Sequence, residues 1–175
     1  MTTARQGKVL PQWVDPLKLA GQGAALGGVI PSEKMTRIAE AVASVGGPVE
    51  VSLQFFRDES GYRVATGDVA VQLELVCQRC LQGMNTTIAL AVQWAIVADE
   101  EQVQSLPKQY DPWLVTEEGG NLHRIVEEDL LLALPIVAFH EPDQCDVEVG
   151  YSSGEFETVK KPGPFEILQN LQFKK

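Results

Sequence analysis

Apolar and polar residues alternate with a period of two through the middle of the chain. The alternation runs over residues 49–55, 69–75 and 88–96, and a shorter stretch of the same kind covers residues 62–64. A period of two places apolar side chains on one face of a strand and polar side chains on the other. Strands with one apolar face are typical of antiparallel sheets. The pattern therefore predicts an antiparallel sheet of at least four strands.

Helical spacing of apolar residues appears in three other places. Residues 35–45 follow Ser32, a plausible N-cap, and the sequence Gly-Gly-Pro comes directly after them. An acidic start at Asp99 predicts a short helix that ends before Pro107. Asn121 precedes a longer periodic run that ends at Pro135, so we expect it to cap a second, longer helix. The fold class predicted is therefore α+β, with a few helices packed on the sheet.

The two ends of the chain have a different character. Residues 1–30 mix leucines with two prolines and several glycines, which predicts an extended, partly packed arm rather than a helix. Residues 160–175 carry apolar residues at helical spacing and form the predicted C-terminal amphipathic tail. The chain has no internal repeat and no low-complexity linker. We therefore expect a single domain over residues 1–175.

The charge balance restricts the partners of the chain. Its 175 residues include 14 Lys and Arg against 24 Asp and Glu, a formal net charge of −10. Such a chain is repelled by phosphate unless its few cations are clustered. No apolar run approaches the roughly 18 residues of a membrane span, and the N-terminus does not resemble a secretory signal. Three cysteines, an odd number, favour a reducing compartment, so we expect a cytoplasmic protein without membrane contact.

The cysteines carry the clearest candidate chemistry. Cys77 and Cys80 form a CxxC turn directly after a predicted strand, and the third cysteine, Cys145, lies five residues after His140. Together these four residues make a Cys₃His donor set, which is sufficient for a structural zinc ion. A redox dithiol is a weaker interpretation, because it needs the pair at a helix N-terminus in a βαβ unit. A third interpretation, which the residue pattern alone favours over zinc, is that the cysteines are small apolar residues without metal.

Catalytic signatures are not recognisable in the sequence. The serines lack a GxSxG context, and no phosphate-binding glycine loop is present. Three consecutive carboxylates, residues 127–129, fit the solvated face of a helix. We therefore expect a protein that is not an enzyme.

The few cations supply candidate contacts for RNA or for an acidic partner, although ordinary solubilising termini explain most of them equally well. The candidates are Arg79, Lys160, Lys161, Lys174 and Lys175.

Four segments of the chain resemble those of one protein family. They are Val-Cys-Gln-Arg-Cys-Leu at 76–81, Leu-Pro-x-x-Tyr-x-Pro at 106–112, the run at 127–137, and Lys-Pro-x-Pro-Phe-x-x-Leu-x-x-Leu at 161–171. In order and spacing they resemble the YceD-like large ribosomal RNA subunit accumulation proteins. The resemblance implies a non-catalytic role in ribosome large-subunit biogenesis, in the normal synthesis, processing or accumulation of 23S rRNA.

The resemblance and the charge together leave two hypotheses for the partner. In the first, the protein binds 23S rRNA or its precursor through a local cluster of cations. In the second, it is an acidic binding module or chaperone for a basic ribosomal protein, whose charge a chain of −10 complements. Other branches of the family carry a denser cysteine cluster, and this chain has His140 with Cys145 in its place.

Overall fold

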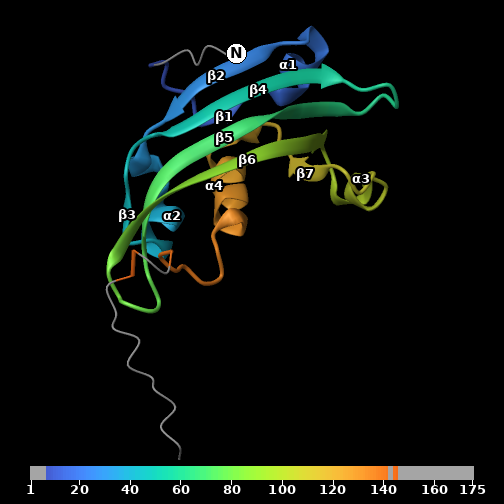
Figure 1. Ribbon diagram of the computed structural model, residues 1–175. Helices are drawn as coiled ribbons and strands as arrows, with labels where there is room; N and C mark the ends of the chain where they lie inside the picture. The colour runs from blue at the N-terminus through green and yellow to red at the C-terminus, as the bar shows by residue number, and fades with distance from the viewer. Residues whose placement is uncertain (1–6, 142–143, 146–175) are drawn as a thin grey trace, which may run out of the picture.

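A six-stranded sheet forms the centre of the computed structural model, which describes residues 7–141 and 144–145 (Figure 1). Its neighbouring strands are antiparallel except for the last pair, which is parallel. The α+β class is confirmed, and the parallel pair makes the sheet mixed rather than antiparallel throughout. The strand order is β2 (Ala25–Ile30), β4 (Val49–Arg57), β5 (Arg63–Val76), β6 (Gly83–Val97) and β7 (Asp111–Leu114), with β3 (Ser44–Val45) beside β5.

The two strands predicted at 62–64 and 69–75 are one continuous strand, β5. Gly67 falls between the two predicted strands and lies opposite Leu53 of β4 within the ladder. A Cβ at this position would collide with the carbonyl oxygen of Ser52. Glycine is therefore required here for the close approach of two backbones, rather than for a turn.

The β5–β6 hairpin extends beyond the end of β4. Its pairing runs from Val64 opposite Ala95 to Val76 opposite Gly83. Figure 1 shows the tip of this hairpin reaching past the rest of the sheet. Residues 43–46 cover the edge of β5 that β4 leaves open, through β3 and through two flanking backbone hydrogen bonds to β5 of 2.9 and 2.8 Å.

The prediction of an extended arm over residues 1–30 is wrong for its second half. Residues 16–22 form helix α1 (Pro16–Gln22), and β2 follows it in the sheet. Asp15 caps α1 by accepting a hydrogen bond from the Lys18 N–H at 2.9 Å. Pro16 lies in the first turn, where a missing N–H costs nothing, and Gly23 ends the helix at a φ of 61°. Two of the residues that argued against a helix, Pro16 and Gly23, are therefore its terminal signals.

The chain before α1 lies against the outer edge of β2. The Leu10 N–H donates to the Val29 carbonyl, and the Val29 N–H donates to the Lys8 carbonyl, each at 2.9 Å. Leu10 is almost fully buried. A short strand β1 (Trp13–Val14) then pairs with β8 (Gly120–Asn121) in a separate two-stranded sheet.

The helix predicted over residues 35–45 is shorter than expected. A 3₁₀ turn, η1 (Ser32–Lys34), comes first, and α2 (Thr36–Ala41) follows. The backbone becomes extended at Val42, and Ser44–Val45 then pair with β5 as β3. Ser32 makes no side-chain cap, so its predicted role is wrong. The reason is tertiary, because pairing with β5 overrides the local helical pattern.

The other two predicted helices are confirmed. In α3 (Glu100–Gln104) the Asp99 side chain accepts from the Gln102 N–H at 2.8 Å. In α4 (Leu122–Ala133) the Asn121 side chain accepts from the Arg124 N–H at 3.0 Å. Figure 1 shows α4 crossing one face of the sheet.

The core lies between the sheet and its helices. Trp94 of β6 and Trp113 of β7 meet edge to face, with ring centroids 5.5 Å apart. The largest fully buried side chains are Trp94, Phe55, Leu10, Ile30, Met35, Ile38, Leu73, Leu122 and Leu130.

The predicted amphipathic tail at 160–175 lies outside the described residues. Within residues 7–141 and 144–145, none of the helices has the length and apolarity needed to cross a membrane.

Candidate functional site

Two segments far apart in the sequence meet at the tip of the β5–β6 hairpin. The tip is a tight turn in which the Cys77 N–H donates to the Gln82 carbonyl and the Leu81 N–H donates to the Cys77 carbonyl, both at 2.9 Å. Leu81 closes the turn with a φ of 60°, in the left-handed region. The Gln78 N–H donates to the Ala138 carbonyl at 2.8 Å, which joins the turn to the chain that leaves α4.

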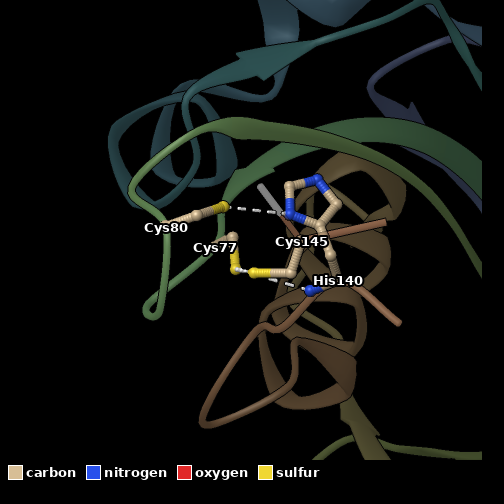
Figure 2. A group of neighbouring side chains, drawn as sticks. All are labelled: Cys77, Cys80, His140 and Cys145. Atoms are coloured by element: carbon tan, nitrogen blue, oxygen red, sulfur yellow. Dashed lines mark hydrogen bonds between the residues drawn. The ribbon is translucent and has the colours of Figure 1, made fainter. Parts of the chain in front are cut away.

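The four predicted metal ligands come together at this junction. Figure 2 shows Cys77 and Cys80 on the turn, facing His140 and Cys145. Their donor atoms all lie within 4.8 Å of one another. The sulfurs of Cys77 and Cys145 are 3.8 Å apart, and the Cys80 sulfur is 3.2 Å from His140 Nδ1. Cys77 is fully buried, and the other three side chains are partly exposed.

This arrangement fits a tetrahedral metal ion better than it fits a disulfide. Two sulfurs bound to one zinc ion at about 2.3 Å each are about 3.8 Å apart, and a sulfur and a nitrogen are about 3.6 Å apart. The observed separations of 3.8 Å and 3.2 Å are close to these values. A disulfide needs sulfurs about 2.05 Å apart, and all three cysteines are free. Three thiols and one imidazole are also the donor types that zinc prefers.

The environment of the turn changes the acidity of its two thiols. Burial raises the pKa of Cys77, but the backbone N–H groups of Cys80, His140 and Arg79 outweigh burial and lower that pKa from 9.0 to about 5. For Cys80, hydrogen bonding from the Gln82 backbone lowers the pKa, but burial and the neighbouring sulfurs prevail and raise it. The Cys77 thiol ionises readily, whereas the Cys80 thiol resists ionisation. A bound metal cation would stabilise the second thiolate, so the cluster is suited to a metal ion.

Arg79, predicted as a contact for RNA or a partner, lies against the same cluster. Its Nε donates to the Cys145 sulfur at 3.1 Å, and its Nη2 donates to the His140 carbonyl at 3.0 Å. The guanidinium therefore holds the segment after α4 and places a positive charge beside the thiols. Its contact with RNA stays a prediction, and the four predicted contact lysines, Lys160, Lys161, Lys174 and Lys175, lie outside the described residues.

The three carboxylates at 127–129 are not simply a solvated helix face. Glu127 is buried, and its Oε1 accepts from the backbone N–H groups of Arg37 and Ile38 at 2.8 and 3.2 Å. Asp129 accepts from the indole of Trp94. The prediction is right only for Glu128, which is partly exposed and forms ion pairs. The pattern of charges did not show that two of the three face α2 and the sheet.

A polar cavity that the sequence analysis did not anticipate lies where α2 meets the start of α4. Its volume is about 210 Å³. His123 lines it and is buried, with its Nε2 3.1 Å from the Leu10 carbonyl oxygen. No local motif marks the cavity, because its walls come from segments up to 115 residues apart. The lining residues are Gln12, Lys34, Thr36, Asn121, His123, Arg124 and Glu127.

Comparison with known proteins agrees with the resemblance noted in the sequence. Residues 65–172 match the family described as "Large ribosomal RNA subunit accumulation protein YceD". A protein of that name from Haemophilus influenzae is 34% identical over 169 residues, which cover 94% of this chain and 97% of the relative. No solved structure matches the chain. The family match and the near full-length alignment together show that this chain belongs to the YceD family of large ribosomal RNA subunit accumulation proteins.

Proposed function

We propose that this protein is a non-catalytic factor in the biogenesis of the large ribosomal subunit, acting in the bacterial cytoplasm by binding precursor 23S rRNA. The observation that carries the proposal is the alignment with the Haemophilus influenzae relative, because it extends over 94% of the chain and that relative is named for accumulation of large-subunit RNA.

The contacts of the polar side chains support a role without catalysis. Glu127 is engaged by backbone N–H groups, Asp129 by Trp94, and Glu128 by two arginines. His123 lies against a backbone carbonyl. Each of these groups already stabilises the packing of α4, which is a structural use of the residues that could otherwise serve as acid or base.

We also propose that Cys77, Cys80, His140 and Cys145 bind one structural zinc ion. The donor types and the separations of 3.8 and 3.2 Å favour this assignment. A closed site with four protein ligands leaves no position for substrate, so its role is to fasten the chain after α4 to the hairpin. Arg79 offsets the surplus negative charge that three thiolates give to such a site.

The zinc proposal is tested by elemental analysis of the purified full-length protein. We expect about one zinc per chain, and loss of that zinc in Cys80→Ser and Cys145→Ser. Gln144→Ala is the matched control, because it changes the same segment but removes no ligand. A wild-type protein without stoichiometric metal, or metal that persists in both cysteine variants, contradicts the proposal.

The ribosomal role is tested by depleting the protein from its own cells. We expect a selective loss of large subunits in sucrose gradients, with a lower ratio of large- to small-subunit RNA. An unchanged profile and ratio contradict the role. Complexes purified from the same cells separate the two kinds of partner, because RNase dissolves an RNA complex and leaves a complex with a basic ribosomal protein intact.

A further inference from the structure

The cavity between α2 and α4 differs in charge from the rest of this acidic protein. Lys34 and Arg124 line it, and Arg37 lies next to them. Arg37 and Arg124 share one carboxylate, Glu128, at 3.4 and 3.0 Å. Within the lining itself two cations, Lys34 and Arg124, stand against one carboxylate, Glu127, so the balance of the lining is positive on a chain whose net charge is −10. A local excess of cations is the condition under which an acidic protein attracts phosphate.

The one carboxylate that lines the cavity, Glu127, already accepts hydrogen bonds from the backbone of α2. Glu127 Oε1 accepts from the backbone N–H groups of Arg37 and Ile38, at 2.8 and 3.2 Å. Its side chain is buried, whereas Lys34 and Arg124 are exposed at the mouth of the cavity. An approaching anion therefore meets the two cations before it meets the carboxylate.

Neutral hydrogen-bond donors complete the lining. The Asn121 oxygen is occupied by the Arg124 N–H, which leaves the amide NH₂ of Asn121 to donate. The side chains of Gln12 and Thr36 add an amide donor and a hydroxyl donor to the lining. Arg and Lys side chains together with neutral amide and hydroxyl groups are the donors that bind phosphate oxygens of nucleic acids.

The size of the cavity narrows the choice of anion. Pockets for drug-sized ligands occupy about 300–1,000 Å³. This cavity, at about 210 Å³ and open to solvent, is smaller than that range. It suits one phosphate group that belongs to a larger molecule lying outside the cavity.

We propose that this cavity, with Lys34 and Arg124 at its mouth, binds a backbone phosphate of RNA. The inference rests on the proposed function, because it names the place at which the precursor RNA is held. It would also allow a chain with a net charge of −10 to bind RNA through residues 12–127 of the described structure.

The test measures binding of the full-length protein to fluorescent transcripts that tile precursor 23S rRNA, over a series of salt concentrations. For the Lys34→Gln/Arg124→Gln double variant we expect affinity to fall by about ten-fold and the salt slope of log K to shrink by about 1 to 2. The Lys18→Gln/Lys108→Gln variant makes the same change of net charge on exposed side chains outside the cavity lining, and its affinity stays within about two-fold of wild type.

A second pair of variants tests the cavity without removing a cation. Gln12→Glu places a carboxylate in the lining and repels phosphate, whereas Gln109→Glu adds the same charge outside the lining. We expect only Gln12→Glu to weaken RNA binding. We expect all four variants to remain folded, because the substituted side chains are exposed. Thermal unfolding of each variant checks this.

The outcomes separate this inference from the proposed function. If wild type binds none of the transcripts, direct RNA binding fails and the cavity assignment falls with it. If wild type binds but the cavity variants match their controls, only the cavity assignment is overturned. If inorganic phosphate shifts the cavity amides in NMR spectra while RNA affinity is unchanged in the double variant, the cavity holds a small anion and the RNA assignment is likewise overturned.

Discussion

The indole N–H of Trp94 donates a 2.8 Å hydrogen bond to Asp129 Oδ2 and so joins β6 to α4. Trp94 is fully buried, and Asp129 is half buried. Burial raises the pKa of Asp129, the negative charges of Asp111 and Glu128 raise it further, and the hydrogen bond from Trp94 opposes them. The carboxyl group therefore stabilises the folded state as a hydrogen-bond acceptor, whereas its negative charge destabilises the folded state.

Substitution of Asp129 separates these two effects. Asp129→Asn keeps an acceptor for Trp94 and removes the charge, so we expect the free energy of unfolding at pH 7 to stay the same or rise slightly. Asp129→Ala leaves the buried indole N–H without a partner and lowers that free energy by about 1–3 kcal/mol. Urea denaturation of both variants beside wild type measures the difference. Equal destabilisation by Asn and Ala contradicts the expectation.

The raised pKa of Asp129 also predicts a dependence on pH. A carboxyl group that binds its proton more tightly in the folded state contributes stability at pH values below its unfolded pKa, and this contribution is lost as the pH rises through its folded pKa. Wild type therefore gains stability relative to Asp129→Asn as the pH falls from 7 towards the ordinary value of 3.8. Unfolding curves of the two proteins over this range show the trend, and a constant difference between them refutes it.

Glu127 connects α4 to the start of α2. Because its Oε1 accepts from the N–H groups of Arg37 and Ile38, Glu127→Ala strands two backbone donors. We expect the free energy of unfolding to fall by about 2–3 kcal/mol, with a smaller loss for Glu127→Gln, which keeps an acceptor. Glu128→Gln is the control, since an exposed ion pair contributes only about 0–1 kcal/mol. Equal effects of the substitutions at Glu127 and Glu128 count against a stabilising role for the hydrogen bonds of Glu127 to Arg37 and Ile38.

Gly67 allows the close approach of β4 and β5. Gly67→Ala forces a Cβ against the Ser52 carbonyl, so we expect a loss of about 1–3 kcal/mol in thermal or urea unfolding. Gly47 has open space at its Cβ position and no positive φ, so Gly47→Ala serves as the matched control and leaves stability within about 0.5 kcal/mol. A stable Gly67→Ala protein shows that the backbones can separate without cost.

Metal removal is expected to loosen the hairpin junction locally. The Gln78 N–H donates to the Ala138 carbonyl, and the proposed zinc ligands lie on the same two segments. A chelator therefore accelerates hydrogen exchange at Gln78 while amides of β5 and β6 near Trp94 keep their protection. In Cys145→Ser, exchange at Gln78 is fast from the start and chelator adds nothing. Uniform acceleration through the sheet, or none at all, disagrees with a local clamp.

Local signals were the most predictable part of this fold. The caps at Asp99 and Asn121 depend on side chains three residues from the donor they satisfy. The alternating strands follow from a pattern that repeats within each strand. The donor set of the candidate metal site was also predictable, because three cysteines and few histidines leave little choice.

Features that depend on distant pairing escaped prediction. The helical pattern before Val45 yields to pairing with Leu73. Strand β7 contains a proline and no alternation, and only its contact with β6 defines it. The hydrogen bonds of Glu127 to the Arg37 and Ile38 N–H groups join residues 90 and 89 positions apart, and the cavity beside them is lined by segments up to 115 positions apart. No local pattern carries such information.

The borders of the main sheet are protected unequally. The chain at residues 8–10 lies along β2, and β7 is only four residues long and contains Pro112. β7 pairs only with residues 94–97 of β6, so within the described part of the chain no strand lies along the outer edge of β6 over residues 83–93. A strand edge without a neighbour is a template for an added strand. The sheet therefore resists augmentation by a partner's backbone at β2 and β7, but not along this stretch of β6.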